Sequence, residues 1–210
     1  TGGLIGAVHT STVQDSFTNG TVVGDAMDQG GLAGSIYGTI VGGDDYDKYD
    51  KNSYVGSHII ECHTSGPVSG RGAVGGLIGN TNYFSHVLRS YATGNVTGNG
   101  SWVGGLVGIV CNYSVVEQSF AAGDVSNGRI LTGGLVGHLS TGGEILDSYS
   151  LGNILGLGGG VGGLVGSVEG VLLNDKTDPL DDEVLGATIL RSYSAGSPAG
   201  PYSIGGFLGD

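Results

Sequence analysis

The sequence is poor in cations and in long apolar runs. It holds seven lysines and arginines against nineteen acids, a formal net charge of −12, and the seven cations are scattered. Recognition of a phosphate backbone or of an anionic membrane surface needs clustered cations, so we expect neither nucleic acid nor a lipid surface as a partner. No stretch approaches about eighteen consecutive apolar residues, which argues against insertion into a membrane.

Helical and catalytic patterns are also missing. No segment carries a useful length of the 3.6-residue apolar period of a helix. The glycine-rich runs lack the Gly-x-Ser-x-Gly turn of serine hydrolases. Outside two short segments the acids are isolated in sequence, whereas glycoside hydrolysis uses paired carboxylates. We therefore predict that the chain is not an enzyme and requires no cofactor.

Only two cysteines are present, Cys62 and Cys111. In the repeat described below they fall two coils apart, at ~9.6 Å, and in different columns. A disulfide needs Cα atoms within about 7 Å, so we predict two free thiols, with Cys62 replacing a buried serine.

What the chain has in excess is glycine, 46 residues, placed at a regular period. Seven copies of a Gly-Gly-Leu-x-Gly motif recur, the last with Phe207 in place of the leucine, and their starts lie 28, 45, 29, 29, 29 and 43 residues apart. The copies begin at Gly2, Gly30, Gly75, Gly104, Gly133, Gly162 and Gly205. A fixed period near 29 is typical of stacked repeats, whose units bury their apolar faces only against neighbours.

A second motif follows each of the first six copies, as in Val87-Leu-Arg-Ser-Tyr-Ala-Thr-Gly94, and a short third segment such as Asn95-Val-Thr-Gly98 usually comes next. One repeat is thus three brief β-prone segments bounded by Gly, Asn or Asp, residues that accept tight corners. We predict one all-β domain over residues 1–210: a single-stranded right-handed β-solenoid of about six coils, with three strands per coil.

Equivalent residues of successive coils should form columns along the axis. We assign Leu4, Leu32, Leu77, Leu106, Leu135, Leu164 and Phe207 to one core column. A small residue precedes an aromatic one in the second motif, and strict alternation would point the small residue inward and the ring outward. A corner at this point would instead send the ring into the core. If exposed, the rings form a candidate ligand-binding stripe, with His63 in the same column: Phe17, Tyr91, Phe120, Tyr149 and Tyr193.

Two insertions interrupt the period, at residues 38–58 and 170–186, and should leave the solenoid as surface loops. Nine of the nineteen acids lie in them. These acids are Asp44, Asp45, Asp47, Asp50, Asp175, Asp178, Asp181, Asp182 and Glu183. Oxygen ligands at this density suit calcium, so these acids form a candidate calcium site, although neither segment fits an EF-hand. The alternative is a pair of solvated acidic loops that bind no metal.

Sequons for N-glycosylation occur at Asn19, Asn95, Asn99 and Asn112. Neither end of the chain carries a visible polar cap, which repeat proteins normally have. We therefore expect as partners either adjoining repeats of a longer chain or end-to-end self-association.

The pattern Val-Gly-Gly-Leu-Val-Gly followed by Ser-Tyr-Ala-Thr-Gly-Asn-Val-Thr-Gly resembles the GLUG-motif repeats of large bacterial and archaeal surface proteins. The resemblance runs over the whole chain and implies an extracellular, cell-surface structural or adhesive segment that acts as a stalk or display surface. It brings no catalytic residues. Two alternatives remain open: a subunit of a head-to-tail extracellular filament, and a carbohydrate-binding or carbohydrate-active β-helix with a glycan or other surface ligand.

Overall fold

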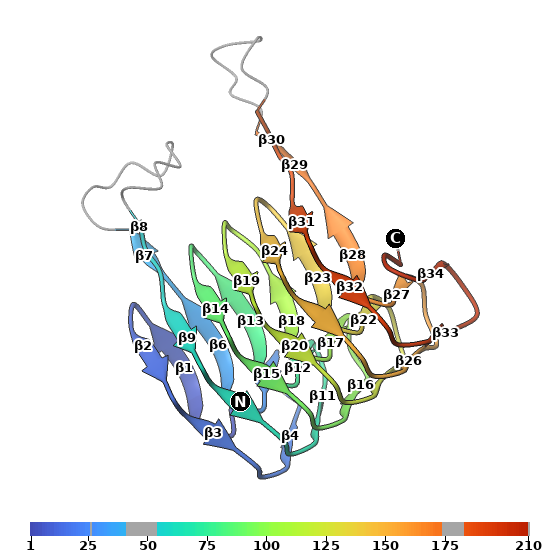
Figure 1. The fold of residues 1–210 in the computed structure, drawn as a ribbon, viewed down its shortest axis with the longest axis horizontal. Coiled ribbons are helices and arrows are strands. Elements are labelled where there is room, and N and C mark those ends of the chain that lie inside the picture. The colour runs from blue at the N-terminus through green and yellow to red at the C-terminus, as the bar shows by residue number, and fades with distance from the viewer. Residues whose placement is uncertain (26, 41–53, 174–182, 210) are drawn as a thin grey trace.

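The chain folds into a β-solenoid in which six coils stack along one axis (Figure 1). A computed structural model describes residues 1–25, 27–40, 54–173 and 183–209. Within these ranges every regular element is a strand, and no helix has the length and apolar character needed to cross a membrane. The all-β solenoid of about six coils predicted from the glycine period is therefore confirmed.

Each coil contributes one strand to each of five six-stranded sheets, and all pairs within these sheets are parallel. We number the sheets in the order in which the chain enters them. Sheet 1 holds β1 (Ile5–His9), β6 (Ala33–Tyr37), β13 (Ile78–Asn82), β18 (Val107–Val110), β23 (Val136–Ser140) and β28 (Val165–Glu169). Sheet 2 holds β2 (Thr12–Gln14), β9 (His58–Ile60), β14 (His86–Leu88), β19 (Val115–Glu117), β24 (Glu144–Leu146) and β31 (Thr188–Leu190).

The other three sheets complete the cross-section of the coil. Sheet 3 holds β3 (Phe17–Thr18), β10 (His63–Thr64), β15 (Tyr91–Ala92), β20 (Phe120–Ala121), β25 (Tyr149–Ser150) and β32 (Tyr193–Ser194). Sheet 4 holds β4 (Val22–Gly24), β11 (Val68–Gly70), β16 (Val96–Gly98), β21 (Val125–Asn127), β26 (Ile154–Gly156) and β33 (Pro198–Ala199). Sheet 5 holds β5 (Asp28–Gly30), β12 (Ala73–Gly75), β17 (Trp102–Gly104), β22 (Thr132–Gly133), β27 (Val161–Gly162) and β34 (Ile204–Gly205).

The prediction of three strands per coil is wrong, because two of the three β-prone segments bend. The glycine motif splits between sheet 5 and sheet 1, as β12 and β13 do around Gly75–Leu77. The second motif splits between sheet 2 and sheet 3, as β14 and β15 do around Arg89, whose φ is 46°. The third segment alone remains one strand, in sheet 4. A coil therefore has five strands and five corners.

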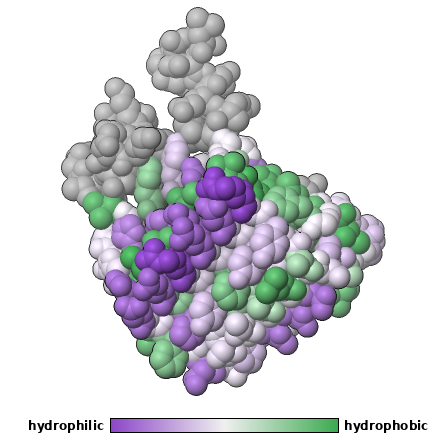
Figure 2. Space-filling view, viewed as in Figure 1, coloured by the Kyte–Doolittle hydropathy of each residue, from purple (hydrophilic) through white to green (hydrophobic). Residues whose placement is uncertain are grey.

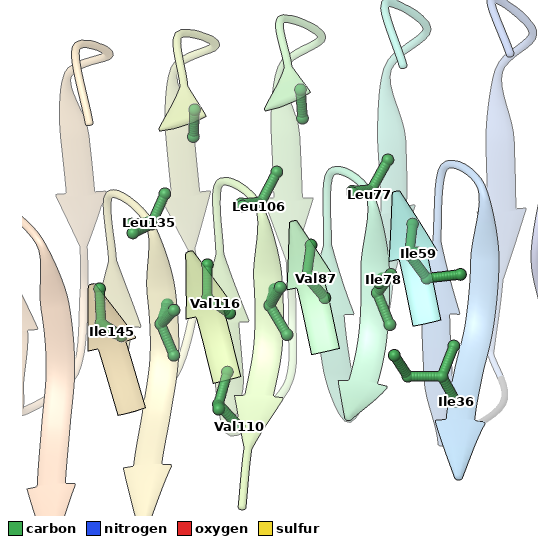
Figure 3. Close-up of a cluster of buried hydrophobic side chains, with 14 of the residues drawn as sticks. Ile36, Ile59, Leu77, Ile78, Val87, Leu106, Val110, Val116, Leu135 and Ile145 are labelled. Atoms are coloured by element: carbon green, nitrogen blue, oxygen red, sulfur yellow. The ribbon is translucent and has the colours of Figure 1, made fainter. Parts of the chain in front are cut away.

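The predicted leucine column is confirmed. Leu32, Leu77, Leu106, Leu135 and Leu164 are fully buried, and the N–H of each leucine donates to the carbonyl of the next column member at 2.8–2.9 Å. Figure 3 shows Leu77, Leu106 and Leu135 side by side in the interior, facing a second row formed by Ile59, Val87, Val116 and Ile145 of sheet 2. The two terminal members, Leu4 and Phe207, are exposed.

A second, smaller core lies between sheets 4 and 5. It is made almost entirely of valine, with five residues from sheet 4 and three from sheet 5: Val22, Val68, Val96, Val125 and Ile154, and Val74, Val103 and Val161. The glycine motif lies between this core and the main core. The chain is closely packed there, since a Cβ on Gly76 would lie 2.2 Å from the carbonyl oxygen of Gly105 and 2.8 Å from Cβ of Ala92. Only glycine fits where the chain passes between the two cores.

In each of the two predicted insertions, a strand near the start pairs antiparallel with a strand near the end, so the base of the insertion is a hairpin. β7 (Thr39–Ile40) pairs with β8 (Tyr54–Val55), and β29 (Val171–Leu173) pairs with β30 (Glu183–Leu185). Each hairpin connects sheet 1 to sheet 2, so both leave the solenoid at the same corner (Figure 1).

Candidate functional site: the serine, charged and aromatic ladders

Sheets 2 and 3 meet at a corner that repeats in every coil and carries a row of charged, a row of serine and a row of aromatic side chains. The residue before the small residue of the second motif adopts a left-handed conformation each time, with φ between 46° and 54°. These residues, which we call the charged column, are Asp15, Glu61, Arg89, Gln118, Asp147 and Arg191. They are polar because the corner turns their side chains towards solvent.

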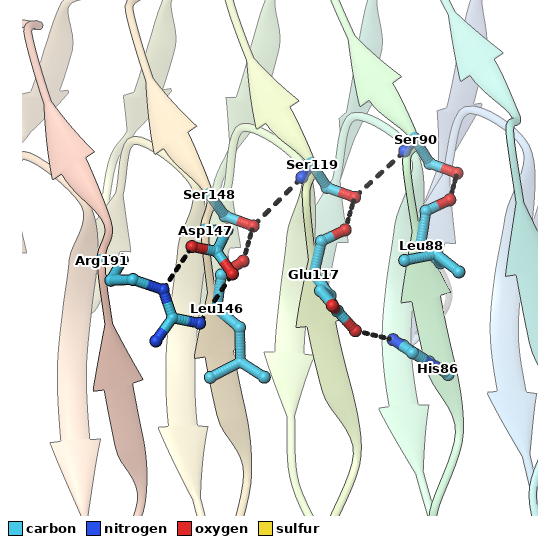
Figure 4. Close-up of polar contacts among 9 residues, drawn as sticks. All are labelled: His86, Leu88, Ser90, Glu117, Ser119, Leu146, Asp147, Ser148 and Arg191. Carbon is cyan, nitrogen blue, oxygen red and sulfur yellow. Dashed lines mark hydrogen bonds and ion pairs between the residues drawn. The ribbon is translucent and has the colours of Figure 1, made fainter.

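The next residue in each coil points inward and forms a serine ladder: Ser16, Cys62, Ser90, Ser119, Ser148 and Ser192. The N–H of Ser90 donates to Oγ of Ser119 at 3.1 Å, and the N–H of Ser119 donates to Oγ of Ser148 at 3.1 Å (Figure 4). Each hydroxyl in turn donates to the carbonyl two residues earlier, as Ser119 does to Glu117 at 2.7 Å. The ladder therefore satisfies buried N–H groups that the left-handed corner removes from the ordinary strand pairing.

Removing one rung should destabilise the fold measurably. In the Ser119→Ala variant the buried N–H of Ser90 loses its acceptor, so we expect a loss of about 1–3 kcal/mol in the free energy of unfolding, measured by urea denaturation. Ser119→Cys should lose less, because Cys62 already serves at this position.

The matched control for that measurement is Ser126→Ala. The Ser126 hydroxyl lies on the outer face and contacts Thr97 Oγ1 at 3.3 Å, so its removal should cost less than about 0.5 kcal/mol. Equal losses in Ser119→Ala and Ser126→Ala would show that the ladder contributes nothing.

The aromatic residues that follow the serine ladder lie on the surface, in one continuous stack. Neighbouring ring centroids are 4.8–5.2 Å apart and the ring planes are within 8° of parallel. This aromatic ladder consists of Phe17, His63, Tyr91, Phe120, Tyr149 and Tyr193. The corner predicted by one of the two sequence interpretations is present, but it turns the rings outward, so the exposed arrangement is the one that forms.

The geometry of the stack limits what it can bind. The four internal rings have a neighbour over each face and are only partly exposed, whereas Phe17 and Tyr193 at the ends are 63% and 52% exposed. The exposed part of each internal ring is consequently its outer edge. A sugar packs its C–H groups on the electron-rich face of a ring, and such a free face exists only at the two ends.

Charged residues beside the aromatic ladder pair between coils. Arg89 Nε lies 2.8 Å from Glu61 Oε1, and Arg191 holds both carboxylate oxygens of Asp147 at 2.6 and 2.8 Å (Figure 4). The hydrogen bonds from the arginines lower the pKa of both acids. Figure 2 shows the strongly hydrophilic side chains of this face as a band along the solenoid axis. Such exposed pairs add little stability each but keep the surface polar.

Two histidines sit close to acids elsewhere on the surface. His86 Nε2 lies 3.0 Å from Glu117 Oε2, and burial nevertheless lowers the pKa of His86 (Figure 4). His138 Nε2 lies 3.5 Å from Glu169 Oε2, and burial lowers its pKa as well. Among the residues that the structure describes, no group of three His, Cys, Asp or Glu side chains could hold a metal ion.

The two thiols are free, as predicted. Cys62 is buried in the serine ladder, and its Sγ donates to the carbonyl of Ile60 at 3.3 Å. Burial raises the pKa of Cys62 and raises that of Cys111 to about 11. Both cysteines are therefore poor nucleophiles at neutral pH.

The candidate calcium ligands fall largely outside the described residues. Asp44, Asp45, Asp47, Asp50, Asp175, Asp178, Asp181 and Asp182 all lie there, and Glu183 begins β30. The candidate calcium site therefore stays a prediction.

Three of the four sequon asparagines, Asn19, Asn95 and Asn99, are exposed. Asn112 is half-buried, its amide donates to Asn82 Oδ1 at 2.6 Å, and the hydroxyl residue of its sequon, Ser114, is fully buried. Modification of Asn112 would require the loss of this contact.

One repeated interaction was not anticipated from the sequence. The small residue after each ring points inward beside the second glycine of the motif, and where it carries a hydroxyl it can donate to that glycine's carbonyl. Thr64 donates to Gly76 at 2.7 Å and Ser150 to Gly163 at 2.6 Å. The signal was present, since this position holds only Thr, Ala or Ser in all six coils.

These features define a β-solenoid repeat protein in which equivalent residues of successive coils pair with one another. The GLUG motif matches residues 70–97, which run from the end of β11 through β12–β15 into β16, one turn of the solenoid. This match confirms the resemblance and is consistent with a GLUG-repeat protein, since the same glycine, leucine, serine and aromatic positions recur in register in the other coils. No curated protein matches the chain.

Proposed function

We propose that the chain is a rigid structural segment of an extracellular cell-surface protein, which acts as a stalk and displays loops from one corner. The observation that carries this proposal is the unbroken register of equivalent residues through all six coils. In sheet 4, for example, one outward column runs Val23, Ser69, Thr97, Ser126, Leu155, Ala199 without a slip.

We expect the solenoid to be stiff because hydrogen bonds and core packing connect each coil to the next on all sides. Five columns of backbone hydrogen bonds run parallel to the axis, and the two apolar cores continue from coil to coil. Bending would have to open strand pairing on one side and compress closely packed backbone on the other. The glycine contacts between coils leave no space for that compression.

Display is supported by the position of the two hairpins. Both leave between sheet 1 and sheet 2, in the second and the sixth coil, so four coil steps of ~4.8 Å separate them along one edge, or ~19 Å. Nine of the nineteen acids of the chain lie in these insertions. They are the parts of the chain that differ from the repeat, and loops on rigid scaffolds commonly carry recognition.

Stiffness can be tested by distance measurements between spin labels. In a Cys62→Ser, Cys111→Ser background, nitroxides would be attached to Cys in the pairs Val23→Cys with Leu155→Cys and Val23→Cys with Ala199→Cys. We expect two narrow distributions near 19 and 24 Å, apart from the label arms, separated by one coil step of ~4.8 Å. Broad distributions, or equal means for both pairs, would contradict a rigid stalk.

Location is tested separately. Antibodies raised against the purified chain should label intact, unpermeabilised cells of the source organism. Labelling that appears only after permeabilisation would overturn the cell-surface assignment while leaving the stiffness result in place.

A further inference from the structure

The chain contains three Asn-Gly dipeptides: Asn19-Gly20, Asn99-Gly100 and Asn127-Gly128. In such a pair the backbone nitrogen of the glycine can attack Cγ of the asparagine, because glycine has no Cβ to block the approach and adopts conformations closed to other residues. Ring closure requires a side-chain amide that is free to turn and a glycine N–H that no acceptor holds. The structure distinguishes the three dipeptides on both requirements.

Asn99 and Gly100 meet both requirements. They lie in the bend between β16 and β17, outside either strand, and the Asn99 side chain is exposed. Among the described residues, no hydrogen bond holds the side-chain amide of Asn99 or the N–H of Gly100. The backbone N–H of Asn99 donates to the carbonyl of Gly70 at 2.9 Å, so the bend is anchored on one side while the reacting atoms are left free.

Asn19 and Gly20 are restrained least. They lie at the corner between β3 and β4 in the first coil, and both are exposed. Among the described residues, neither the Asn19 side chain nor the Gly20 N–H takes part in a hydrogen bond. No heavy atom lies within 4 Å of a Cβ built on Gly20, whereas a Cβ on Gly100 would lie 2.2 Å from the nitrogen of Gly72. The backbone therefore has more room to rearrange at Asn19 than at Asn99.

Asn127 and Gly128 are held at every reacting group. The Asn127 side chain is buried, and its Nδ2 donates to the carbonyl of Ile130 at 2.9 Å. Its Oδ1 accepts a hydrogen bond from the N–H of Arg129 at 3.1 Å. The N–H of Gly128 donates to the carbonyl of Gly98 in the preceding coil at 3.0 Å. Three hydrogen bonds would have to open before this dipeptide could react.

We propose that Asn19 and Asn99 are sites of spontaneous covalent modification, at which the folded chain converts asparagine to aspartate and isoaspartate, and that the fold protects Asn127. The glycine nitrogen gives its proton to hydroxide and forms a bond to Cγ of the asparagine. The bond from Cγ to the amide nitrogen breaks and ammonia leaves, which closes a cyclic imide. Water then opens the ring at Cγ to give aspartate, or at the main-chain carbonyl to give isoaspartate.

The modification has a charge and a backbone consequence. Each event adds one negative charge to a chain whose formal net charge is already −12. Isoaspartate also lengthens the backbone by one carbon, and the contact of Gly100 with Gly72 leaves no space for that carbon at the bend. Isoaspartate at Asn99 should therefore loosen the pairing between the second and third coils. The inference concerns the covalent chemistry of the chain and does not depend on the stalk function.

The test follows the three dipeptides in one molecule. The full chain would be produced in a host that attaches no N-linked glycans, because Asn19 and Asn99 are also sequon asparagines, and incubated in mildly alkaline buffer. Peptide mapping by mass spectrometry detects the exchange of an amino group for a hydroxyl, and isoaspartyl peptides elute separately. We expect Asn19 to react fastest, and both Asn19 and Asn99 to react at least about tenfold faster than Asn127.

Two controls separate the fold from the dipeptide sequence. In the chain unfolded by guanidinium chloride the three rates should converge, because the same dipeptide then has no fold to restrain it. The Asn99→Gln variant can close only a larger, slower-forming ring, so it should stop conversion in the third coil and leave the rate at Asn19 unchanged. Hydroxylamine, which attacks the cyclic imide and cuts the chain there, should cleave the folded protein after Asn19 and Asn99 and spare Asn127.

The proposal is overturned if Asn19 and Asn99 stay unmodified in the folded chain under conditions in which the unfolded chain reacts. It is also overturned if Asn127 reacts as fast as Asn99 in the folded chain, since burial and hydrogen bonding would then not control the reaction. Conversion at only one of Asn19 and Asn99 would remove the other from the assignment, and a faster reaction at Asn99 would contradict the ranking. None of these outcomes bears on the spin-label distances or on cell-surface labelling.

Discussion

Gly105→Ala should destabilise the protein by about 3–5 kcal/mol or prevent it from folding. A Cβ at this position would lie 2.2 Å from the carbonyl oxygen of Gly134 and 2.8 Å from Cβ of Ala121. The first of these atoms is backbone of the next coil and cannot rotate away. Overpacking of a core costs about 1–3 kcal/mol when side chains can adjust, and a clash with fixed backbone lies above that range.

Gly159→Ala is the matched control. No heavy atom lies within 4 Å of a Cβ built there, so the substitution should be neutral or should stabilise the fold by about 0.4–1 kcal/mol through the unfolded chain. Urea unfolding followed by far-ultraviolet circular dichroism measures both variants. If the two substitutions had the same effect, close approach of the coils could not be the reason for the glycine motif.

Leu106→Ala should cost about 2–5 kcal/mol, the second largest effect. Leu106 is fully buried in the middle of the leucine column, between Leu77 and Leu135, and its removal leaves a cavity that flanking coils held by backbone hydrogen bonds cannot close. Leu155→Ala is the comparison, since Leu155 is 49% exposed in sheet 4 and its loss should cost less than about 1 kcal/mol.

The double variant Leu106→Ala, Leu135→Ala tests whether the column acts as one packed row. The two side chains belong to the same buried cluster in adjacent coils, so their effects should differ from the sum of the single effects by at least about 0.5 kcal/mol. Strict additivity would mean that each coil packs independently, against the continuous core that a stiff stalk requires.

The physical reasons behind these two predictions also explain the two most regular features of the chain, the recurring glycines and the recurring leucines. The glycines recur because successive coils pass within backbone contact at the motif, and the leucines recur because each coil can bury its apolar residue only against its neighbours. A stacked repeat therefore selects for the same residue type at the same step, which is why the period is visible without coordinates.

The sequence by itself determined the solenoid, the number of coils, the leucine column and the free thiols. Each of these depends on the identity of residues one period apart, and identical residues stacked in register occupy identical environments. The two insertions were also placed by the period, since they are the steps at which it lengthens.

The tertiary structure alone decided the corners and the surface. Arg89 and its equivalents are not glycine, so nothing in their identity marks a left-handed φ, and the fold has five strands per coil where three were predicted. That corner sends Tyr91 and its equivalents outward, and stacking then covers their faces and exposes their edges. Residue type sets which side chains can form a column, but backbone direction at each corner sets which atoms of the column meet solvent.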